Sequence, residues 1–207
     1  VRREAGKVLI EDLHGLKETY DDVVFATHAD EAFGLLADPS ESERELLGGL
    51  RYTYNRAVLH TDAALMPKRR RVWSSWNFID GRDQGGDGKL CVTYWMNRLQ
   101  ALETNSPLFV TLNPSRDPAP GTIIREFDYT HPFFDRAALA AQRRLWSLQG
   151  DRRTWFCGSY FGYGFHEDAL QSGLAVAEEL GGARRPWSVP DESGRIHMAP
   201  HVQGAAA

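Results

Sequence analysis

The chain has 207 residues, enough to bury a sizeable core in one domain, or in one domain with a smaller part attached. Its composition, 42% hydrophobic and 25% charged, is ordinary for a globular protein, and its net charge of −4 does not indicate binding to nucleic acid or to an anionic membrane. Because no apolar run reaches the roughly 18 residues of a membrane span and no signal peptide is visible, we expect a cytoplasmic protein without a membrane span.

The first part of the chain combines strands and helices. The runs KVLIED (7–12) and YDDVVFAT (20–27) are bounded by Gly or polar residues and predict strands; the second is apolar on both faces, as in a parallel sheet. A short helix is expected over 29–36. Ser40, followed three residues later by Glu43, has the spacing of a capping box and predicts the start of a second helix.

Five closely spaced strand-like runs occupy the middle of the chain. No helical pattern separates them, which indicates an antiparallel sheet. Between residues 56 and 132 these runs read RAVLHTD, RVWSSWNFI, KLCVTYWMN, PLFVTLNP and TIIREFDYTHP.

The last part of the chain returns to alternating elements. A helix with Asp135 as its N-cap and Gly150 just past its end precedes a strand, RTWFCGS, and a helix over 167–180. From about Arg184 the chain is rich in proline and shows no periodic apolar face, so we interpret it as a loose tail.

This order predicts an α+β fold in which an antiparallel sheet is inserted between the parts of an α/β domain. The expected boundaries are 1–50 and 150–183 for the α/β domain, 51–149 for the inserted domain and 184–207 for the tail. Cys91 and Cys157 lie in apolar stretches, and we favour two buried thiols in a reducing compartment over a disulfide.

The turn before the last helix, GSYFGYGFHED (158–168), crowds glycines and aromatic residues together. A strand, a glycine-rich turn and a helix present unpaired backbone N–H groups to an anionic or electron-rich ligand. Gly158, Gly162 and Gly164 have no Cβ, which lets the backbone come close to another group. The acidic residues of the first helical turn fit ordinary helix-end electrostatics. A compact loop without a ligand is the alternative.

The segment WFCGSYFGYGFHEDALQSGLAVAEEL resembles the C-terminal flavin-contacting segment of the flavin-containing amine oxidase family, and most of all its predicted NAD/FAD-binding bacterial members. YDDVVFATHADEAFGLL resembles the strand that returns to the family's FAD-binding sheet, and NRAVLHTD, TYWMNRLQ and FVTLNP resemble its substrate domain. The resemblance covers most of residues 8–182. It implies an FAD-dependent oxidoreductase that transfers hydride from an organic small molecule to the flavin.

The resemblance also implies where this chain would contact FAD. In the family, backbone amides at the start of the last helix approach the flavin edge where negative charge builds on reduction, and the preceding turn meets the ribityl and pyrophosphate part. Many members carry an acidic residue where this chain has Ser159. The corresponding positions are Gly158, Ser159, Gly164, Phe165, His166 and Glu167.

One hallmark of the family is missing. Its members open with a strand, G-x-G-x-x-G and a helix that bind the ADP half of FAD, but this sequence has no such motif and begins Val1-Arg2-Arg3 without methionine. We therefore expect the sequence to be a fragment that binds FAD poorly or not at all and is inactive alone. Its exposed face would then be covered by the missing N-terminal segment or by another chain.

Aromatic residues gather in two of the predicted strands. Alternation places Trp76 and Phe78 on one side of their strand and Tyr94 and Met96 on one side of the other. They form either core or the lining of an apolar substrate cavity, with Asn97 among the polar groups at its edge. A non-catalytic module that binds an apolar ligand or a partner chain through this face is therefore the alternative function.

No catalytic residue is identified from the sequence. His60 in AVLHTD is interpreted as a strand histidine with satisfied hydrogen bonds rather than a base, and no Ser-His-Asp or Cys-His constellation is visible. His166-Glu167-Asp168 are consecutive helix residues that point in different directions, so we expect no metal site there. His166 is either a neighbour of the flavin or a helix-start residue with no special role.

Overall fold

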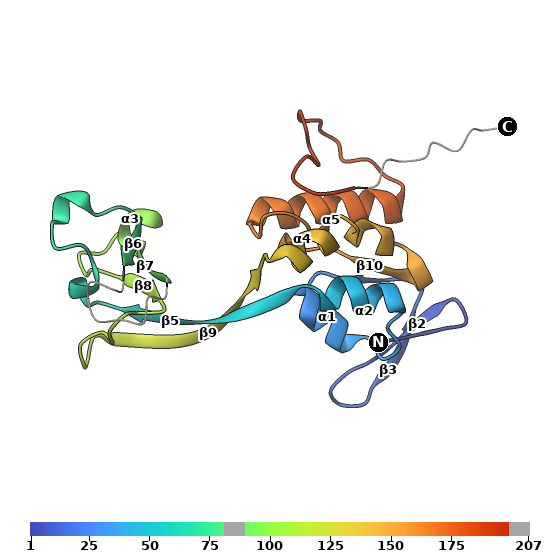
Figure 1. Ribbon diagram of the computed structural model, residues 1–207, viewed down its shortest axis with the longest axis horizontal. Coiled ribbons are helices and arrows are strands. Elements are labelled where there is room, and N and C mark those ends of the chain that lie inside the picture. The colour runs from blue at the N-terminus through green and yellow to red at the C-terminus, as the bar shows by residue number, and fades with distance from the viewer. Residues whose placement is uncertain (81–89, 199–207) are drawn as a thin grey trace. The chain divides into compact units, whose positions relative to one another are not determined.

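A computed structural model describes residues 1–80 and 90–198 of the chain (Figure 1). The chain divides into two compact units. Unit 1 comprises Val1–Tyr52 and Pro132–Ala207, and unit 2 comprises Thr53–His131. Helices and antiparallel sheets are both present, as expected for an α+β protein.

Unit 1 contains two small sheets. An antiparallel meander is formed by β1 (Arg2–Glu4), β2 (Lys7–Glu11) and β3 (Lys17–Tyr20). The second sheet pairs β4 (Val23–Phe25) in parallel with β10 (Thr154–Phe156), as the apolar run around Val23 predicted. Their phenyl rings, Phe25 and Phe156, stack with centroids 5.4 Å apart and join two distant parts of the chain.

Four helices pack around the parallel strand pair. The capping box is confirmed, because the Glu43 N–H donates to Ser40 Oγ at 3.2 Å and the Ser40 N–H donates to Glu43 Oε2 at 2.7 Å. Asp135 Oδ1 accepts from the Ala138 N–H at 2.8 Å, as expected of an N-cap. The helices are α1 (Ala29–Leu35), α2 (Glu41–Gly48), α4 (Arg136–Gln142) and α5 (His166–Gly181).

The segment 132–149 packs differently from the sequence expectation. It was assigned to the inserted domain, but α4 and the 3₁₀ turn after it (Leu145–Leu148) bury Ala138, Ala141 and Leu145 in the core of unit 1. The predicted continuous helix up to Gly150 also ends earlier, at Gln142. Packing against α2 therefore determines that this segment belongs to unit 1. Its position in the sequence, directly after the block of strands, suggested the other domain.

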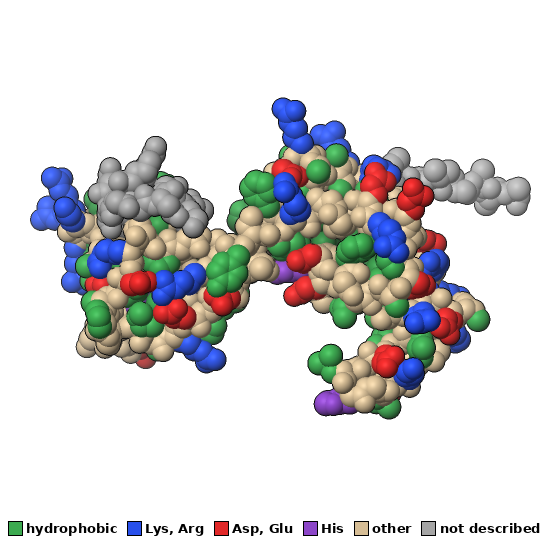
Figure 2. Space-filling model, turned by 60° about the horizontal axis from the view of Figure 1, so that its bottom comes forward, with side chains coloured by type: hydrophobic (Ala, Val, Ile, Leu, Met, Phe, Trp, Pro, Cys, Tyr) green, Lys and Arg blue, Asp and Glu red, His purple; other side chains and the backbone are tan. Residues whose placement is uncertain are grey.

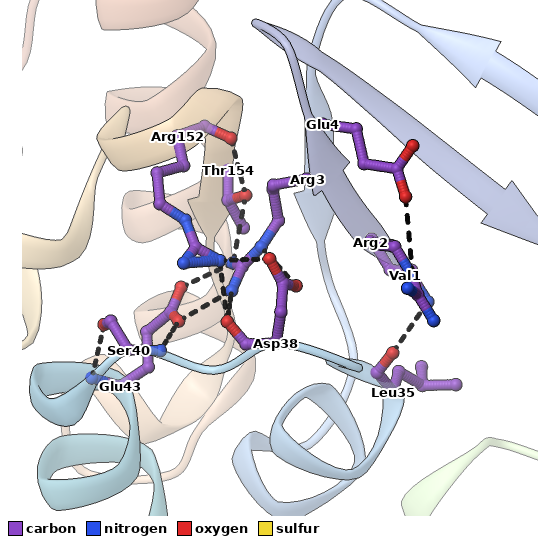
Figure 3. Close-up of polar contacts among 10 residues, drawn as sticks. All are labelled: Val1, Arg2, Arg3, Glu4, Leu35, Asp38, Ser40, Glu43, Arg152 and Thr154. Carbon is purple, nitrogen blue, oxygen red and sulfur yellow. Dashed lines mark hydrogen bonds and ion pairs between the residues drawn. The ribbon is translucent and has the colours of Figure 1, made fainter.

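A buried arginine, Arg3, fastens β1 to the rest of unit 1 (Figure 3). The Arg3 guanidinium donates to both carboxylate oxygens of Glu43, at 2.7 and 2.9 Å, and through Nε to Asp38 Oδ1 at 3.0 Å. It also reaches Thr154 Oγ1 in β10 at 3.3 Å. Burial opposes the ionisation of Glu43, but the hydrogen bonds from Arg3 and from the Ser40 amide outweigh it and lower the pKa of that carboxyl. One side chain thereby ties three segments together.

Residues 183–198, which we call the C-terminal strap, fold back alongside α5 (red in Figure 1). Its Arg185 donates to Glu178 of α5, and its Ile196 is 7% exposed and belongs to the core of unit 1. The sequence suggested a loose tail here. The strap is held by isolated residues such as Arg185 and Ile196. Isolated contacts produce no periodic apolar pattern, so the sequence did not reveal them.

Unit 2 is built on a five-stranded sheet of order β6-β7-β8-β5-β9. All five predicted strands are present, and the β5–β8, β6–β7 and β7–β8 pairs are antiparallel. A short helix, α3 (Met96–Leu99), follows β7. The strands are β5 (Arg51–His60), β6 (Trp76–Asp80), β7 (Leu90–Trp95), β8 (Phe109–Leu112) and β9 (Ile123–Phe133).

A neutral hydrogen-bond chain crosses the buried face of this sheet. His60 Nδ1 accepts the Asp62 N–H at 3.1 Å, so the ring proton lies on Nε2, 2.7 Å from Thr111 Oγ1. Thr111 Oγ1 lies 2.9 Å from Thr93 Oγ1, which donates to the Leu65 carbonyl at 3.3 Å. His60 is fully buried, and burial lowers its pKa. The interpretation of His60 as a satisfied strand histidine is confirmed.

Charged side chains of both signs are mixed on one face of the protein. On the side shown in Figure 2, acidic and basic side chains are interspersed among hydrophobic ones. Both cysteines are free and buried, in agreement with the sequence interpretation. Among the described residues, no helix combines the length and the apolar character needed to cross a membrane.

Candidate functional site

The glycine-rich turn joins β10 to α5. After Phe156 the chain forms a 3₁₀ turn over Ser159–Phe161, and α5 begins at His166. Gly158 (φ 155°) and Gly164 (φ 90°) have backbone conformations that other residues adopt only with strain. Glycine is therefore needed at these two positions for conformational reasons alone.

The three glycines of the turn also make room for the chain's own groups. A Cβ at Gly158 would lie 2.7 Å from the Tyr160 ring, and a Cβ at Gly162 would lie 2.5 Å from the Asp168 carboxylate. At Gly164 the nearest atom would be 3.2 Å away, in the Phe134 ring. The missing side chains thus make the loop compact, so their absence does not by itself indicate a ligand.

The first amides of α5 remain available to a ligand. The Gly164 N–H donates to the Ser159 carbonyl at 3.1 Å, and the Phe165 N–H donates to Asp168 Oδ2 at 2.7 Å. The N–H groups of His166 and Glu167 have no partner within residues 1–80 and 90–198, and both residues are exposed. The positive end of a 16-residue helix therefore faces solvent through two free donors.

The start of the turn is bound to α5. The Gly158 N–H donates to Ser172 Oγ at 3.0 Å, and that hydroxyl lies 3.1 Å from the Gly158 carbonyl. Ser159 is half-buried, and its hydroxyl has no partner among the described residues. Of the six predicted flavin positions, Ser159, His166 and Glu167 keep polar groups free, whereas the N–H groups of Gly158, Gly164 and Phe165 are already bonded.

A buried phenol beneath the turn was missed by the sequence analysis. Tyr160 is 1% exposed, and its hydroxyl has no hydrogen-bond partner among the described residues. Burial, followed by the proximity of Cys157 and Tyr52, raises the pKa of Tyr160 well above its ordinary value. Burial also raises the pKa of the Cys157 thiol. The Tyr160 phenol is therefore neutral, and its hydroxyl is a buried donor without an acceptor among the described residues.

A second missed residue is Asp168, which the sequence suggested was an ordinary acidic residue of a first helical turn. Its side chain is fully buried and accepts from the Phe165 N–H and, at 2.7 Å, from Arg195 Nε. Its partner lies in the C-terminal strap, 27 residues further on. No local pattern in the sequence links these two residues.

Three of the predicted substrate-lining residues share one face of the sheet in unit 2. Trp76 lies opposite Tyr94, and Phe78 lies opposite Val92 on the same side. The side chains of Trp76 and Phe78 are 53% and 54% exposed, so they are not core residues of this unit. We call Trp76, Phe78 and Tyr94 the aromatic face.

Asn97 belongs to a different hollow. Its amide nitrogen donates to the carbonyls of Thr104 and Ser106, and its amide oxygen accepts from the Leu108 N–H, so the side chain organises the following loop. Met96 begins α3 next to it. Asn97 lines a cavity of about 330 Å³ together with Arg70, Trp73 and Trp95, and Trp95 points to the sheet face opposite Tyr94. The structure does not bring Asn97 to the aromatic face.

Comparison with solved structures defines the fold class. The chain has a fold found in several enzymes, although no protein-family model and no curated protein matches its sequence. It is similar to the CLA-producing fatty acid isomerase from P. acnes, with a TM-score of 0.58 and 14% identity over 86% of this chain. It is also similar to a protein assigned as a protoporphyrinogen oxidase from Exiguobacterium, with a TM-score of 0.57 and 12% identity over 87% of this chain.

A third similar structure is that of reduced UDP-galactopyranose mutase, with a TM-score of 0.55 and 9% identity over 88% of this chain. The chain spans 45% of the length of each of the three structures, less than half. At these identities the likeness shows the fold alone. The three names describe an isomerase, an oxidase and a mutase, so the shared fold does not select one reaction.

Proposed function

We propose that this chain is the C-terminal part of an FAD-dependent oxidoreductase of the amine-oxidase-like superfamily. The observation that carries the proposal is the exposed start of α5, where the N–H groups of His166 and Glu167 are free at the positions that the family resemblance assigns to flavin contacts. The likeness of fold to an isomerase, an oxidase and a mutase supports it. The finer expectation, hydride transfer from an organic substrate, belongs to the same proposal.

The residues of the chain would then have distinct tasks. FAD, when bound, supplies the hydride-accepting chemistry. The free amides of His166 and Glu167, together with the helix dipole, would stabilise the negative charge that builds on the ring during reduction. These donors are fixed before the reaction, so they need no reorganisation when the charge develops. The aromatic face would bind an apolar part of the substrate and exclude water.

The parallel strand pair indicates where more protein would be added. The Gln149 side chain covers the outer edge of β10, because it accepts from the Phe156 N–H at 2.9 Å and donates to the Phe156 carbonyl at 2.7 Å. Among the described strands β4 pairs only with β10, and its Phe25 carbonyl accepts from the Cys157 N–H, so the main-chain groups of Val24 point to the other edge. We propose that the missing N-terminal segment or another chain covers this edge.

The test of the flavin site removes one backbone donor. Proline is tolerated at the first position of a helix, and Phe165 already has the extended conformation (φ −100°, ψ 168°) that a following proline requires. His166→Pro therefore deletes the N–H and leaves α5 in place. The ring edge of oxidised FAD is uncharged, and a hydrogen bond to a neutral group contributes about 0.5–1.5 kcal/mol, so we expect the Kd for oxidised FAD to rise roughly twofold to tenfold.

The matched control is His166→Ala, which keeps the N–H and removes only the imidazole. Both variants belong in the longest polypeptide that the gene encodes, with FAD binding followed by visible absorption and flavin fluorescence, and with the 207-residue chain measured beside them. A loss of affinity in His166→Pro but not in His166→Ala supports the amide contact. Equal affinity of both variants and the wild type rejects it.

A second candidate function rests on the exposed aromatic face. Trp76 and Phe78 are half exposed within unit 2, and a non-catalytic module would use such a surface for an apolar ligand or a partner chain. The absorption spectrum separates the two functions. If the longest polypeptide takes up no flavin, the binding module is the better explanation of the aromatic face.

A further inference from the structure

We propose that Arg195 of the C-terminal strap is a positioning residue that locks the flavin-facing turn (158–168) in its binding conformation. The inference rests on the proposed function, because it concerns the same free amides at the start of α5. It assigns a role to a segment that does not itself contribute any of the predicted flavin contacts.

A single carboxylate connects the strap to the start of α5. Arg195 Nε donates to Asp168 Oδ1 at 2.7 Å, and the other oxygen of the same carboxylate accepts from the Phe165 N–H at 2.7 Å. The Asp168 side chain is fully buried, so it needs both partners to offset its loss of solvent. Arg195 therefore fixes the Asp168 carboxylate, and that carboxylate fixes the backbone of Phe165, the residue before the free amide of His166.

The guanidinium also packs on the turn itself. It lies over the Tyr163 ring, 5.2 Å from the centroid, and 6.0 Å from the centroid of the Phe165 ring. These two rings are 68% and 66% exposed, so little else in unit 1 fixes their positions. Arg195 thus contacts the turn through both a hydrogen-bonded ion pair and two cation–π interactions.

The backbone of the strap fixes the place of Arg195. Its N–H donates to Gln171 Oε1 of α5 at 3.1 Å, and the next residue, Ile196, is buried in the core of unit 1. On the turn side, the Arg195 carbonyl lies so near Gly162 that a Cβ there would be only 2.8 Å away. Arg195 is therefore anchored independently of the contacts that its own side chain makes.

Loss of the guanidinium should loosen the turn without unfolding the unit. Asp168 would remain a buried carboxylate with one donor, so it would move toward solvent and release the Phe165 N–H. The two exposed rings would lose their shared partner. The free amides of His166 and Glu167 would then occupy several orientations, and FAD would have to order them on binding.

The test compares Arg195→Met with Arg184→Met in the longest polypeptide that the gene encodes. Arg184 is also a strap arginine, but it bonds to Glu178 and Glu192, away from the turn. Amide hydrogen exchange of Phe165, measured without FAD, reports the lock directly. The Kd for FAD, measured separately, reports its consequence for binding.

We expect Arg195→Met to speed exchange of the Phe165 amide at least tenfold and to raise the Kd for FAD at least fivefold, with Arg184→Met within twofold of the wild type in both. Arg195→Lys, which keeps the charge beside Asp168 but not the planar stack, should give intermediate values, and it decides the matter if Arg195→Met fails to fold.

Unchanged exchange in Arg195→Met and Arg195→Lys would overturn the lock. Faster exchange with an unchanged Kd would show a structural contact without a role in flavin binding, and would also overturn the inference. A wild-type protein that takes up no FAD rejects the proposed function and this role with it. That outcome is recognisable, because the exchange measurement requires no flavin.

Discussion

The two units bury polar groups in different ways. In unit 1 the buried groups include charged ones, and Arg3 joins β1 to the start of α2 and to β10 through Glu43, Asp38 and Thr154. In unit 2 the buried groups are neutral, and the chain from His60 to Thr111 and Thr93 joins three strands of one sheet. The charged cluster connects segments that share no sheet, whereas the neutral chain reinforces a sheet that is already paired. Disrupting the two should therefore cost different amounts.

Arg3→Met should have the largest effect. The substitution keeps much of the buried volume but leaves Glu43 as a buried carboxylate without its cation. Removing one partner of a buried ion pair typically costs about 3–5 kcal/mol. We expect a loss of that size in the free energy of unfolding of unit 1, measured by urea denaturation with hydrogen exchange of the β10 amides to identify the unit.

The double variant Arg3→Met/Glu43→Met provides the control. Because it removes both charges, it should recover a large part of the loss, as apolar replacements of buried ion pairs often do. A double variant as unstable as Arg3→Met would show either that the arginine acts through Asp38 and Thr154 or that the capping-box bond from the Ser40 N–H to Glu43 accounts for the remaining loss.

Thr111→Val should have an intermediate effect, confined to unit 2. Valine has nearly the same shape but cannot accept from His60 Nε2 or donate to Thr93, so two buried polar groups lose a partner. Thr93 still donates to the Leu65 carbonyl, so the main loss is that of the acceptor for the His60 Nε2–H, which costs about 1–3 kcal/mol. Thr53→Val, on the exposed part of β5, is the matched control and should stay within about 0.5 kcal/mol of the wild type. Equal effects of the two variants on the β8 amide exchange would contradict the role of the buried chain.

Local patterns predicted much of the fold because the forces that set these elements are local. Ser40 and Glu43 satisfy each other across three residues, and in unit 2 β6, β7 and β8 pair in the order of the sequence. The pairing of β5 with β8, across the strands between them, is the long-range exception. The parallel placement of β4 also followed from its composition. The placement of α4 did not, because it depends on packing against α2 rather than on its own sequence.

The ion pairs that the sequence missed join residues far apart in the chain. Arg3 meets Glu43 across 40 residues, and Asp168 meets Arg195 across 27, so neither pair forms a motif. Asp168 at the start of a helix resembles any acidic residue of a first turn, and only burial distinguishes it. The glycines were noticed, but their closest contacts are with the chain itself.

The smallest predicted effect is a pH dependence that separates the two units. Burial lowers the pKa of His60; the nearby Asp62 raises it and the nearby Arg116 lowers it further, and the net change is downward. The unfolded chain therefore binds a proton at His60 more readily than the folded chain does. Stability from this site is therefore complete above the unfolded pKa of about 6.5 and falls as the pH drops below it, by at most about 1.4 kcal/mol per pH unit.

The measurement is urea unfolding of the wild type and of His60→Gln from pH 7.5 to 5.5, with exchange of the β5 and β8 amides as the probe of unit 2. Glutamine does not titrate, so the difference in slope between the two proteins isolates His60 from the other groups. Equal dependence of the unfolding free energy on pH in the two proteins would mean that the folded sheet binds the protonated imidazole. Protonation of Nδ1 would break the hydrogen bond that it accepts from the Asp62 N–H. A steeper slope for the wild type, absent from the unit 1 amides, would show that a neutral buried network carries a pH sensitivity confined to its own sheet.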